Sequence, residues 1–548
     1  MHLLLASLFS VSLLSALPLV AHANTETAPQ DNKQANFQLD NQAHLNIATT
    51  EALIMSALEK FHTPGLAVGV VHKGDTLLLK GFGARQLSPK KRAVNEQTYF
   101  RLASTSKAFT AAALGVLVDQ GKLNWQDKVI QHLPEFQMQD AWVTREFTIE
   151  DLLVHRSGLV GGAGDSMIWP EPSGFTRQEV VQNLQYLSPD YSFRSAYSYS
   201  NVLYITAGEV IERVSGQSYA DFLQDTIFNP LNMQCYAGEV PKSAIKNSAT
   251  PYAHNDEKGM YAVPRNGIQE TAQMSVAAGG IVCNAESMTL WLKALLNPST
   301  LPFSESVLDD MWQAHTILGV AETDEEWDGT HFKTYGYGWR LANMFNYKVI
   351  SHTGTLSGYQ AYVALVPELE LGVVLLNNGS NYGVRGSVMQ HILKAFMPRA
   401  NQLAESKIDN WVQAYVDYQD EQEQKYLARQ LPEPVATKPM LIESEDILGT
   451  YSDVWFKDMN IEMKDKTLRL SSSRMLTLVG TLRPFEANKF VVKWDNQNAA
   501  SDAFLIFETD FQGNVTGMKM HPFTAKERSR HEYRDMHFIK QDEASSEK

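Results

Sequence analysis

Apolar and polar positions follow a different pattern in each region of this chain. Between Leu45 and Phe61 the apolar residues recur at helical spacing, which predicts an amphipathic helix. Two apolar runs, residues 65–71 and 76–82, flank a Lys73-Gly74-Asp75 turn and predict a β-hairpin. Residues 104–294 then predict a mostly helical, loop-rich block, which begins with a long apolar helix directly after Ser104.

Strand patterns return after this helical block. Residues 347–351, 359–366 and 371–376 are apolar segments that predict strands, and residues 386–397 predict a helix that closes the region. Strands at both ends of a region with helices between them are typical of an α+β fold, in which the two ends complete one antiparallel sheet. We therefore expect one such domain over residues 42–400.

The last part of the chain has a third pattern. Residues 401–440 predict a polar helix, whose Trp411, Tyr415 and Tyr418 can dock on one side, followed by a Pro-rich linker end. Residues 441–540 contain short alternating segments separated by turn residues, which predict a small all-β sandwich or barrel. We expect residues 541–548 to form a disordered tail.

The first 23 residues predict a signal peptide. An apolar stretch from Leu3 to Val20 precedes the small-x-small site Ala21-His22-Ala23. No Lys or Arg precedes the stretch, which departs from the usual pattern; a transmembrane anchor is the alternative, although serines and Pro18 weaken it. We expect export to the periplasm or the medium, a flexible segment at residues 24–41, and no membrane insertion after cleavage.

The composition and charge of the chain limit the kinds of partner and cofactor that we expect it to bind. The chain has 47 Lys and Arg against 62 Asp and Glu, a net charge of −15, which argues against nucleic acid and anionic membranes. No Cys/His cluster has metal-ligand spacing and no Gly-rich loop follows a strand, so we expect no metal and no other cofactor. The sequence leaves open whether Cys235 and Cys283 form a disulfide and whether the protein forms an oligomer.

A Ser-x-x-Lys spacing occurs four times in the chain, and only Ser104 and Lys107 open a long apolar helix. Residues three apart share one face of a helix, where the lysine amine can take the proton of the serine hydroxyl. The pattern then indicates a serine nucleophile with a lysine base. An ordinary Ser/Thr N-cap on a buried helix explains the same residues.

Two later segments supply what acyl transfer from a serine also needs. In Tyr199-Ser200-Asn201, a phenol with a pKa lowered by a neighbouring ammonium can act as a second base, and Asn201 can hold Lys107 or a substrate amide. In His352-Thr353-Gly354-Thr355, Gly354 lets a substrate backbone approach. There the amide of Thr355 can join that of Ser104 as an oxyanion donor. Each segment alone is explained by a capped loop or a strand end.

Together and in this order, the three segments resemble the Ser-x-x-Lys, Tyr-x-Asn and (Lys/His)-(Thr/Ser)-Gly motifs of the serine β-lactamase and penicillin-binding-protein superfamily. The chain is most similar to its class C-like branch of esterases, D-amino-acid peptidases and related hydrolases. Residues 63–69, 100–104, 147–158 and 277–280 match this branch as well. The segment after Ile442 resembles the small β-domain often appended to these hydrolases.

The resemblance implies a role for each matched position. Ser104 is then the nucleophile, Lys107 and Tyr199 share the base and acid work, and Asn201 orients substrate and Lys107. The amides of Ser104 and Thr355 form the oxyanion hole. His352, Thr353 and Gly354 lie beside it and contact the substrate. His155 also lies in a matching motif, and we interpret it as structural.

The chain departs from the motifs of the superfamily at His352, and this departure affects which substrates we expect. Penicillin-cleaving members of the superfamily usually carry lysine where this chain has His352, and histidine is mostly neutral at pH 7. Carboxylate recognition is then weaker, which favours esters, amides or D-amino-acid peptides over β-lactams. The alternatives are a β-lactamase, a penicillin receptor or sensor that acylates with little turnover, and a structural binding module in which the motifs are coincidental.

Overall fold

The computed structural model describes residues 45–271, 274–397, 408–429, 434–496, 501–523 and 533–542. The chain divides into a unit of residues 1–43 and a unit of residues 44–548. The predicted signal peptide and the flexible segment after it lie outside the described residues, as do positions 543–548 of the predicted tail. In the described parts of the chain, no helix has the length and apolar character needed to cross a bilayer.

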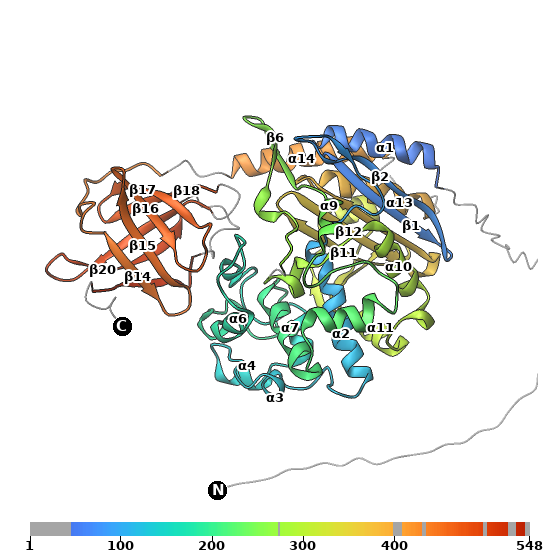
Figure 1. The fold of residues 1–548 in the computed structure, drawn as a ribbon, viewed down its shortest axis with the longest axis horizontal. Coiled ribbons are helices and arrows are strands. Elements are labelled where there is room, and N and C mark those ends of the chain that lie inside the picture. Colours follow the sequence, from blue (N-terminus) through green and yellow to red (C-terminus); the bar gives the residue numbers. More distant parts are fainter. Residues whose placement is uncertain are drawn as a thin grey trace, which may run out of the picture. The chain divides into compact units, whose positions relative to one another are not determined.

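A nine-stranded antiparallel sheet forms the centre of the first domain, in the order β3-β2-β1-β13-β12-β11-β10-β9-β8. Figure 1 shows β1, β2, β11 and β12 of this sheet among the helices of the domain. Strand β1 from the start of the domain pairs with β13 from its end, with Leu66 opposite Asn377. The two ends of the domain therefore complete one sheet, and the predicted α+β fold is confirmed. The strands span β1 (Gly65–His72), β2 (Asp75–Gln86), β3 (Arg92–Ala93), β8 (Thr316–Leu318), β9 (Lys333–Tyr335), β10 (Arg340–Met344), β11 (Tyr347–Leu356), β12 (Tyr359–Val366) and β13 (Leu371–Asn377).

Helices cover the sheet and bury its central strands, which explains why every residue of β13 is buried. On one face α1 (Ile47–Lys60), α13 (Gly383–Phe396) and α14 (Trp411–Ala428) pack on one another. Helix α10 (Ala285–Leu296) packs on β1 and β13. The predicted docking of the polar helix is confirmed, because the ring of Trp327 in α12 (Glu322–Asp328) contacts those of Trp411, Tyr415 and Tyr418 at 5.1–5.6 Å.

The helical block between β3 and β8 carries α2, which is the helix predicted after Ser104. Eleven of its 13 residues are buried, including Lys107, so this helix belongs to the core rather than to the surface. A disulfide joins Cys235 to Cys283 in the same block. Helix α2 spans Lys107–Asp119, and the block also contains α3 (Val129–His132), α4 (Ala141–Glu146), α5 (Ile149–Leu153), α6 (Arg177–Asn183), α7 (Val202–Ser215), α8 (Tyr219–Leu223), α9 (Lys242–Lys246), α11 (Glu305–Met311) and the two small sheets β4 (Phe100–Arg101) with β7 (Val282–Cys283) and β5 (Tyr252–Asn255) with β6 (Gly259–Ala262).

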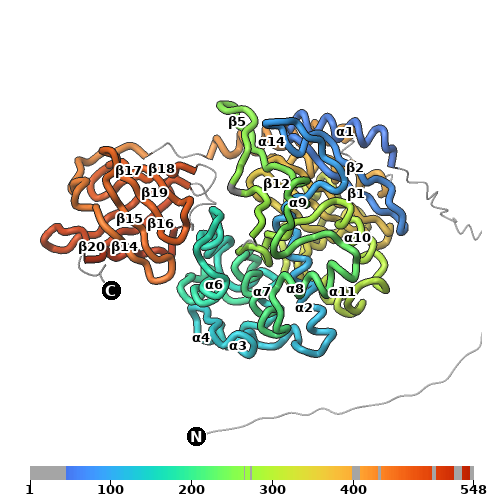
Figure 2. Tube along the Cα trace, viewed as in Figure 1, coloured from blue at the N-terminus to red at the C-terminus, as the bar shows by residue number. Residues whose placement is uncertain are grey.

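The C-terminal β-domain is a closed barrel of eight antiparallel strands (Figure 2). Strand β14 pairs with β21, with Ser452 opposite Ile539. Because this pairing closes the sheet and leaves no open edge, the domain is a barrel, which was one of the two predicted architectures, and not a sandwich. Alternate residues face inward, and Tyr451, Phe490 and Phe507 meet in the core. The strands are β14 (Gly449–Asp453), β15 (Lys457–Lys464), β16 (Thr467–Ser472), β17 (Val479–Glu486), β18 (Lys489–Trp494), β19 (Ala503–Thr509), β20 (Val515–Pro522) and β21 (His537–Lys540).

The structure departs from the sequence expectation in the later strands of the large sheet. Strand β11 continues five residues beyond Ser351 to Leu356, because its polar end pairs with β12, with Thr355 opposite Gln360. The short strands β8, β9 and β10 were not predicted at all.

Candidate active site

Ser104 lies on a tight 3-10 turn (Ala103–Ser106) that leads directly into α2. The residue before it, Ala103, has φ 48°, a left-handed conformation that non-glycine residues rarely adopt and that is often found at functional sites. Ser104 is half-buried, whereas Lys107 is fully buried. The strained turn therefore leaves the serine accessible while it sends the lysine into the core.

Lys107 makes three contacts with its amine. Nζ lies 2.7 Å from Asn201 Oδ1, 2.7 Å from the carbonyl oxygen of Ala278 and 3.5 Å from Ser104 Oγ. The first two oxygens only accept hydrogen bonds, so a neutral amine gives them its two N–H groups and keeps its lone pair for Ser104. Burial lowers the pKa of this amine well below its usual range, and Asp165 opposes part of the shift. The geometry and the pKa both suit a base for the serine.

Tyr199 packs against the same amine. Its ring centroid lies 4.7 Å from Lys107 Nζ, and its buried hydroxyl has no hydrogen-bond partner among the described residues. Burial raises the pKa of this phenol, and the nearby Arg340 and Ser104 offset only part of the increase. The expectation of a lowered phenol pKa was therefore wrong, because desolvation outweighs the opposing effect of the Arg340 cation. Tyr199 is a neutral phenol that can donate a proton or relay one.

The segment that carries Tyr199 is held from two sides. His155, which is fully buried, accepts a hydrogen bond from the Ser200 amide at its Nδ1 (3.1 Å), and its ring lies 4.2 Å from that of Tyr199. On the other side, Asn201 Nδ2 donates to both oxygens of Asp165, at 3.2 and 3.0 Å. Nothing in the sequence pattern had pointed to Asp165.

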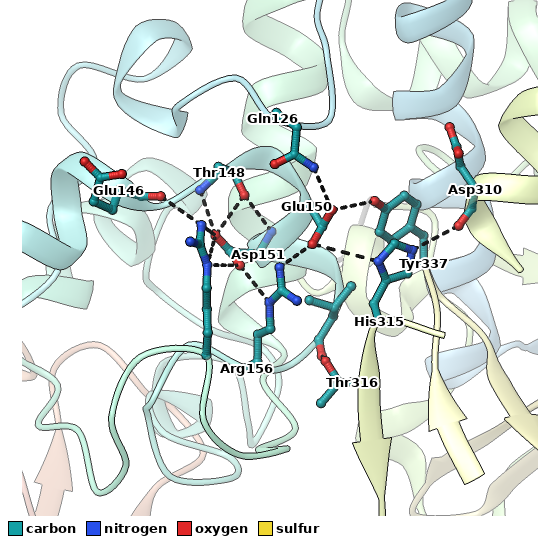
Figure 3. A network of polar contacts seen from close by, with 12 residues as sticks. Gln126, Glu146, Thr148, Glu150, Asp151, Arg156, Asp310, His315, Thr316 and Tyr337 are labelled. Atoms are coloured by element: carbon teal, nitrogen blue, oxygen red, sulfur yellow. Dashed lines mark hydrogen bonds and ion pairs between the residues drawn. The ribbon is translucent and has the colours of Figure 1, made fainter. Parts of the chain in front are cut away.

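A charged network fixes the segment on which His155 lies (Figure 3). Asp151 accepts hydrogen bonds from the Thr148 amide, from Arg156 and from Arg194, the last at 2.6 Å. Its neighbour Glu150 accepts from the Tyr337 hydroxyl at 3.0 Å, from Gln126 and from Arg156. The matching sequence of residues 147–158 is thus explained by packing and charge pairing that hold His155 in place.

His352 is buried, and both of its ring nitrogens have partners within the protein. Its Nε2 lies 2.9 Å from the Tyr335 hydroxyl and its Nδ1 lies 2.8 Å from the carbonyl oxygen of Thr353. Because that carbonyl only accepts, Nδ1 carries the proton and Nε2 accepts from Tyr335. Burial, together with Arg340 and Lys107, lowers the pKa of His352 well below its usual range. His352 is therefore neutral with both ring nitrogens occupied, and its predicted contact with substrate stays a prediction.

Strand β11 presents a partly open edge beside the serine. Strand β10 pairs with β11 only as far as Arg340 opposite Ser351, so the backbone from His352 to Leu356 has no described strand neighbour on that side. Gly354 lies against the turn of Ser104: a β-carbon on it would fall 2.3 Å from the Leu102 carbonyl oxygen and 3.2 Å from the Ser104 amide nitrogen. This contact brings the backbone that directly precedes Thr355 next to the Ser104 amide, and the oxyanion role of the two amides stays a prediction.

Two arginines that sequence reasoning missed flank this edge. Arg340 Nη1 lies 3.5 Å from Thr353 Oγ1, and no described carboxylate lies within ion-pair distance of its guanidinium. Arg385 donates to the carbonyl oxygen of Gly354 and, at 3.0 Å, to Thr355 Oγ1. Within the described parts of the chain, no group of three or more His, Cys, Asp or Glu residues could hold a metal.

The chain is similar to known proteins over both of its domains. Residues 50–393 match the Beta-lactamase family, and residues 434–538 match a domain of unknown function (DUF3471). Unguisins hydrolase ungD' of Aspergillus campestris is 29% identical over 408 residues, which cover 71% of this chain and 72% of that protein.

Two solved structures share the fold. The octameric penicillin-binding protein homologue from Pyrococcus abyssi has a TM-score of 0.57 and 20% identity, covering 90% of this chain and all of that one. D-amino acid amidase from Ochrobactrum anthropi SV3 has a TM-score of 0.53 and 22% identity, covering 64% of this chain and 98% of that one.

Proposed function

Because this chain belongs to the beta-lactamase family, we propose that it is a serine hydrolase that works through an acyl-enzyme on Ser104. The observation that carries the proposal is the buried Lys107 amine, whose lone pair is directed at Ser104 Oγ over 3.5 Å by two shorter contacts to carbonyl oxygens. An amine with a lowered pKa can be neutral near neutral pH and is then a competent base.

In the first half-reaction, Lys107 takes the proton of Ser104 while Oγ attacks the carbonyl carbon of the substrate. The amides of Ser104 and Thr355 stabilise the oxyanion of the tetrahedral intermediate, and losing one such donor costs a factor of about 10²–10³ in rate. The neutral phenol of Tyr199 donates a proton to the leaving alcohol or amine, and Lys107 returns the first proton to Tyr199. Water then attacks the acyl-Ser104 ester through the same groups in reverse order.

We further propose that the substrates are esters, amides or D-amino-acid peptides. The neutral, buried His352 cannot pair with a substrate carboxylate, but Arg340 offers a cation beside Thr353 that no described carboxylate neutralises. Loss of a charge-assisted hydrogen bond changes binding by about 1.5–3 kcal/mol, or roughly 10- to 100-fold. Substrates with a carboxylate near the scissile bond are therefore compatible with this site despite the missing lysine.

The test compares two ester substrates that differ only in a carboxylate next to the leaving group, using the wild type and Arg340→Gln. We expect Arg340→Gln to lower kcat/KM for the carboxylate ester at least about tenfold relative to the neutral ester. An unchanged ratio would remove Arg340 from substrate recognition. No hydrolysis of esters, amides or D-amino-acid peptides by a folded wild type would contradict the proposed activity.

The second candidate is a β-lactamase or a penicillin receptor that acylates with little turnover. A burst of one product equivalent per Ser104 from a chromogenic cephalosporin, without a steady state, would favour the receptor. Sustained turnover would favour the β-lactamase. We also propose export to the periplasm or the medium, on the N-terminal sequence alone, and cell fractionation of the native protein tests that.

A further inference from the structure

The Asn201 side chain links Lys107 to a carboxylate. Its Oδ1 accepts from Lys107 Nζ at 2.7 Å, and its Nδ2 donates to Asp165 Oδ1 and Oδ2 at 3.2 and 3.0 Å. A carboxylate can only accept hydrogen bonds. As long as Asp165 is ionised, the Asn201 amide can therefore adopt only the orientation with its carbonyl toward Lys107.

The opposite orientation of Asn201 would disable the base. Its Nδ2 would then face Lys107 and donate to the lone pair of the neutral amine, which otherwise points to Ser104. The two short contacts that direct the lone pair would be reduced to the one with the Ala278 carbonyl oxygen, at 2.7 Å. The orientation of one amide thus decides whether the amine can deprotonate the serine.

Asp165 is well placed to impose that orientation. Its loop is tied to the segment of Tyr199 by a hydrogen bond from the Gly162 amide to the Tyr199 carbonyl oxygen (2.9 Å), and the Asp165 amide donates to Gly162 at 3.0 Å. Among the described residues its carboxylate forms no direct ion pair, and the cation that acts on it is Lys107, on the other side of the Asn201 amide. A partly buried carboxylate without a direct ion pair is unfavourable for stability, which points to a role in function.

We propose that Asp165 is a positioning residue for the base. Its carboxylate fixes the orientation of the Asn201 amide, so that the lone pair of Lys107 Nζ stays directed at Ser104 Oγ. Its negative charge also changes the pH at which Lys107 loses its proton. The inference rests on the proposed function. Besides each other, Asp165 and Lys107 are faced by Tyr199, by Arg340 of β10, by His155 and by His352 of β11. Burial lowers the pKa of both histidines well below its usual range, so they are neutral and Arg340 carries the further charge at this position. Burial raises the pKa of the Asp165 carboxyl to about 7, while Asn201 and Lys107 act in the opposite direction.

The direction of the pH effect follows from the charges. The Asp165 carboxylate stabilises the ammonium form of Lys107, so it raises the pH at which Lys107 becomes a free base. Removing that charge moves the rising limb of the activity profile to lower pH. Because the Asp165 carboxyl and the Lys107 amine interact, the pH of the rising limb reflects the coupled titration of both groups and not the pKa of either one alone. A purely structural change at Asp165 would lower the rate at every pH without moving the limb.

The experiment measures the second-order rate constant for labelling of Ser104 by a neutral fluorophosphonate, from about pH 5 to pH 10, in the full-length protein. Asp165→Asn removes the charge and keeps one acceptor oxygen in a side chain of almost the same shape, so we expect its limb about one pH unit lower. Because the new amide can also donate to a reversed Asn201, we expect its plateau to be no higher than that of the wild type. Asp165→Ala also removes the acceptor, and we expect its plateau to fall about 10- to 100-fold. Asp127→Asn is the matched control, because Asp127 also accepts from an asparagine amide, Asn124 Nδ2 at 3.3 Å; its profile should not move.

A double-mutant comparison shows whether Asp165 acts through Asn201. In an Asn201→Ala background, we expect Asp165→Ala to lower the plateau less than about threefold. An equal loss in both backgrounds, or an Asp165→Asn limb that coincides with that of the wild type, overturns the inference. An Asp165→Asn limb that coincides with that of the wild type is also the result expected if Asp165 instead binds the ammonium group of a substrate, because the neutral fluorophosphonate has no such group. No labelling of the wild type at Ser104 would overturn the proposed function and this inference with it.

Discussion

Gly354 tests whether the position of β11 against the serine turn matters for catalysis. A β-carbon on Gly354 would fall 2.3 Å from the Leu102 carbonyl oxygen, 3.0 Å from Ala103 Cβ and 3.2 Å from the Ser104 amide nitrogen. Real β-carbons essentially never come within 3.0 Å of another heavy atom, and nine in ten of their contacts are longer than 3.4 Å. The nearest atoms belong to the backbone, so no side-chain rotation relieves the clash, and strand and turn must separate by roughly 1 Å.

The size of the effect follows from that displacement. A misplacement of about 1 Å at a reacting centre costs on the order of 10²-fold in rate, or about 2.7 kcal/mol in the barrier. Overpacking a well-packed site also lowers the free energy of unfolding by about 1–3 kcal/mol. We therefore expect Gly354→Ala to be folded, less stable, and labelled by a fluorophosphonate about a hundred times more slowly than the wild type.

The assay is the second-order rate constant of labelling at Ser104, with urea unfolding measured on the same samples. Gly319→Ala is the matched control, because a β-carbon there meets no atom within 4 Å and the backbone has no positive φ. We expect the control to match the wild type in both measurements. A Gly354→Ala variant that is labelled within about threefold of the wild-type rate would refute the reasoning that the contact of β11 with the turn builds the oxyanion site.

Two further predictions concern stability. Glu171→Gln leaves Arg101 buried without its charge partner, to which it now donates at 2.6 and 3.1 Å, and should lower the free energy of unfolding in urea by about 3–5 kcal/mol. Glu51→Gln, in the exposed pair with Lys80, should change it by less than about 1 kcal/mol, and equal losses would contradict the argument from burial. Replacing both Cys235 and Cys283 by Ala removes a cross-link across 48 residues and should cost about 4 kcal/mol in the same assay, whereas a change below about 1 kcal/mol would be contrary to expectation.

Local sequence was sufficient for the elements that local patterns determine. The apolar helix after Ser104, the first hairpin and strands β12 and β13 follow from periodicity, and the pairing of β1 with β13 follows from strands at both ends of the domain. The extension of β11 through Thr353 and Gly354 did not follow, because a polar, glycine-containing stretch has low strand propensity. Its pairing with β12 overrides that propensity.

The candidate site was predictable to the extent that its residues lie in short motifs. Lys107, Tyr199 and Asn201 come together around Ser104, as their order in the sequence suggested. Asp165 and Arg340 lie in a glycine-rich loop and a short strand without a motif, and only tertiary packing brings them to the site. The raised pKa of Tyr199 depends on the balance of burial and charge, which no sequence pattern records.

The most direct test of the central claim is the intact mass of the protein after exposure to a fluorophosphonate and, separately, to a penicillin. Wild type and Ser104→Ala are treated side by side. The account predicts one fluorophosphonate adduct on the wild type and none on Ser104→Ala, and an additional Ser104-dependent penicillin adduct would move the substrate toward cell-wall peptides. A folded wild type without any adduct, or an equal adduct on Ser104→Ala, would contradict the assignment of Ser104 as the acylated nucleophile.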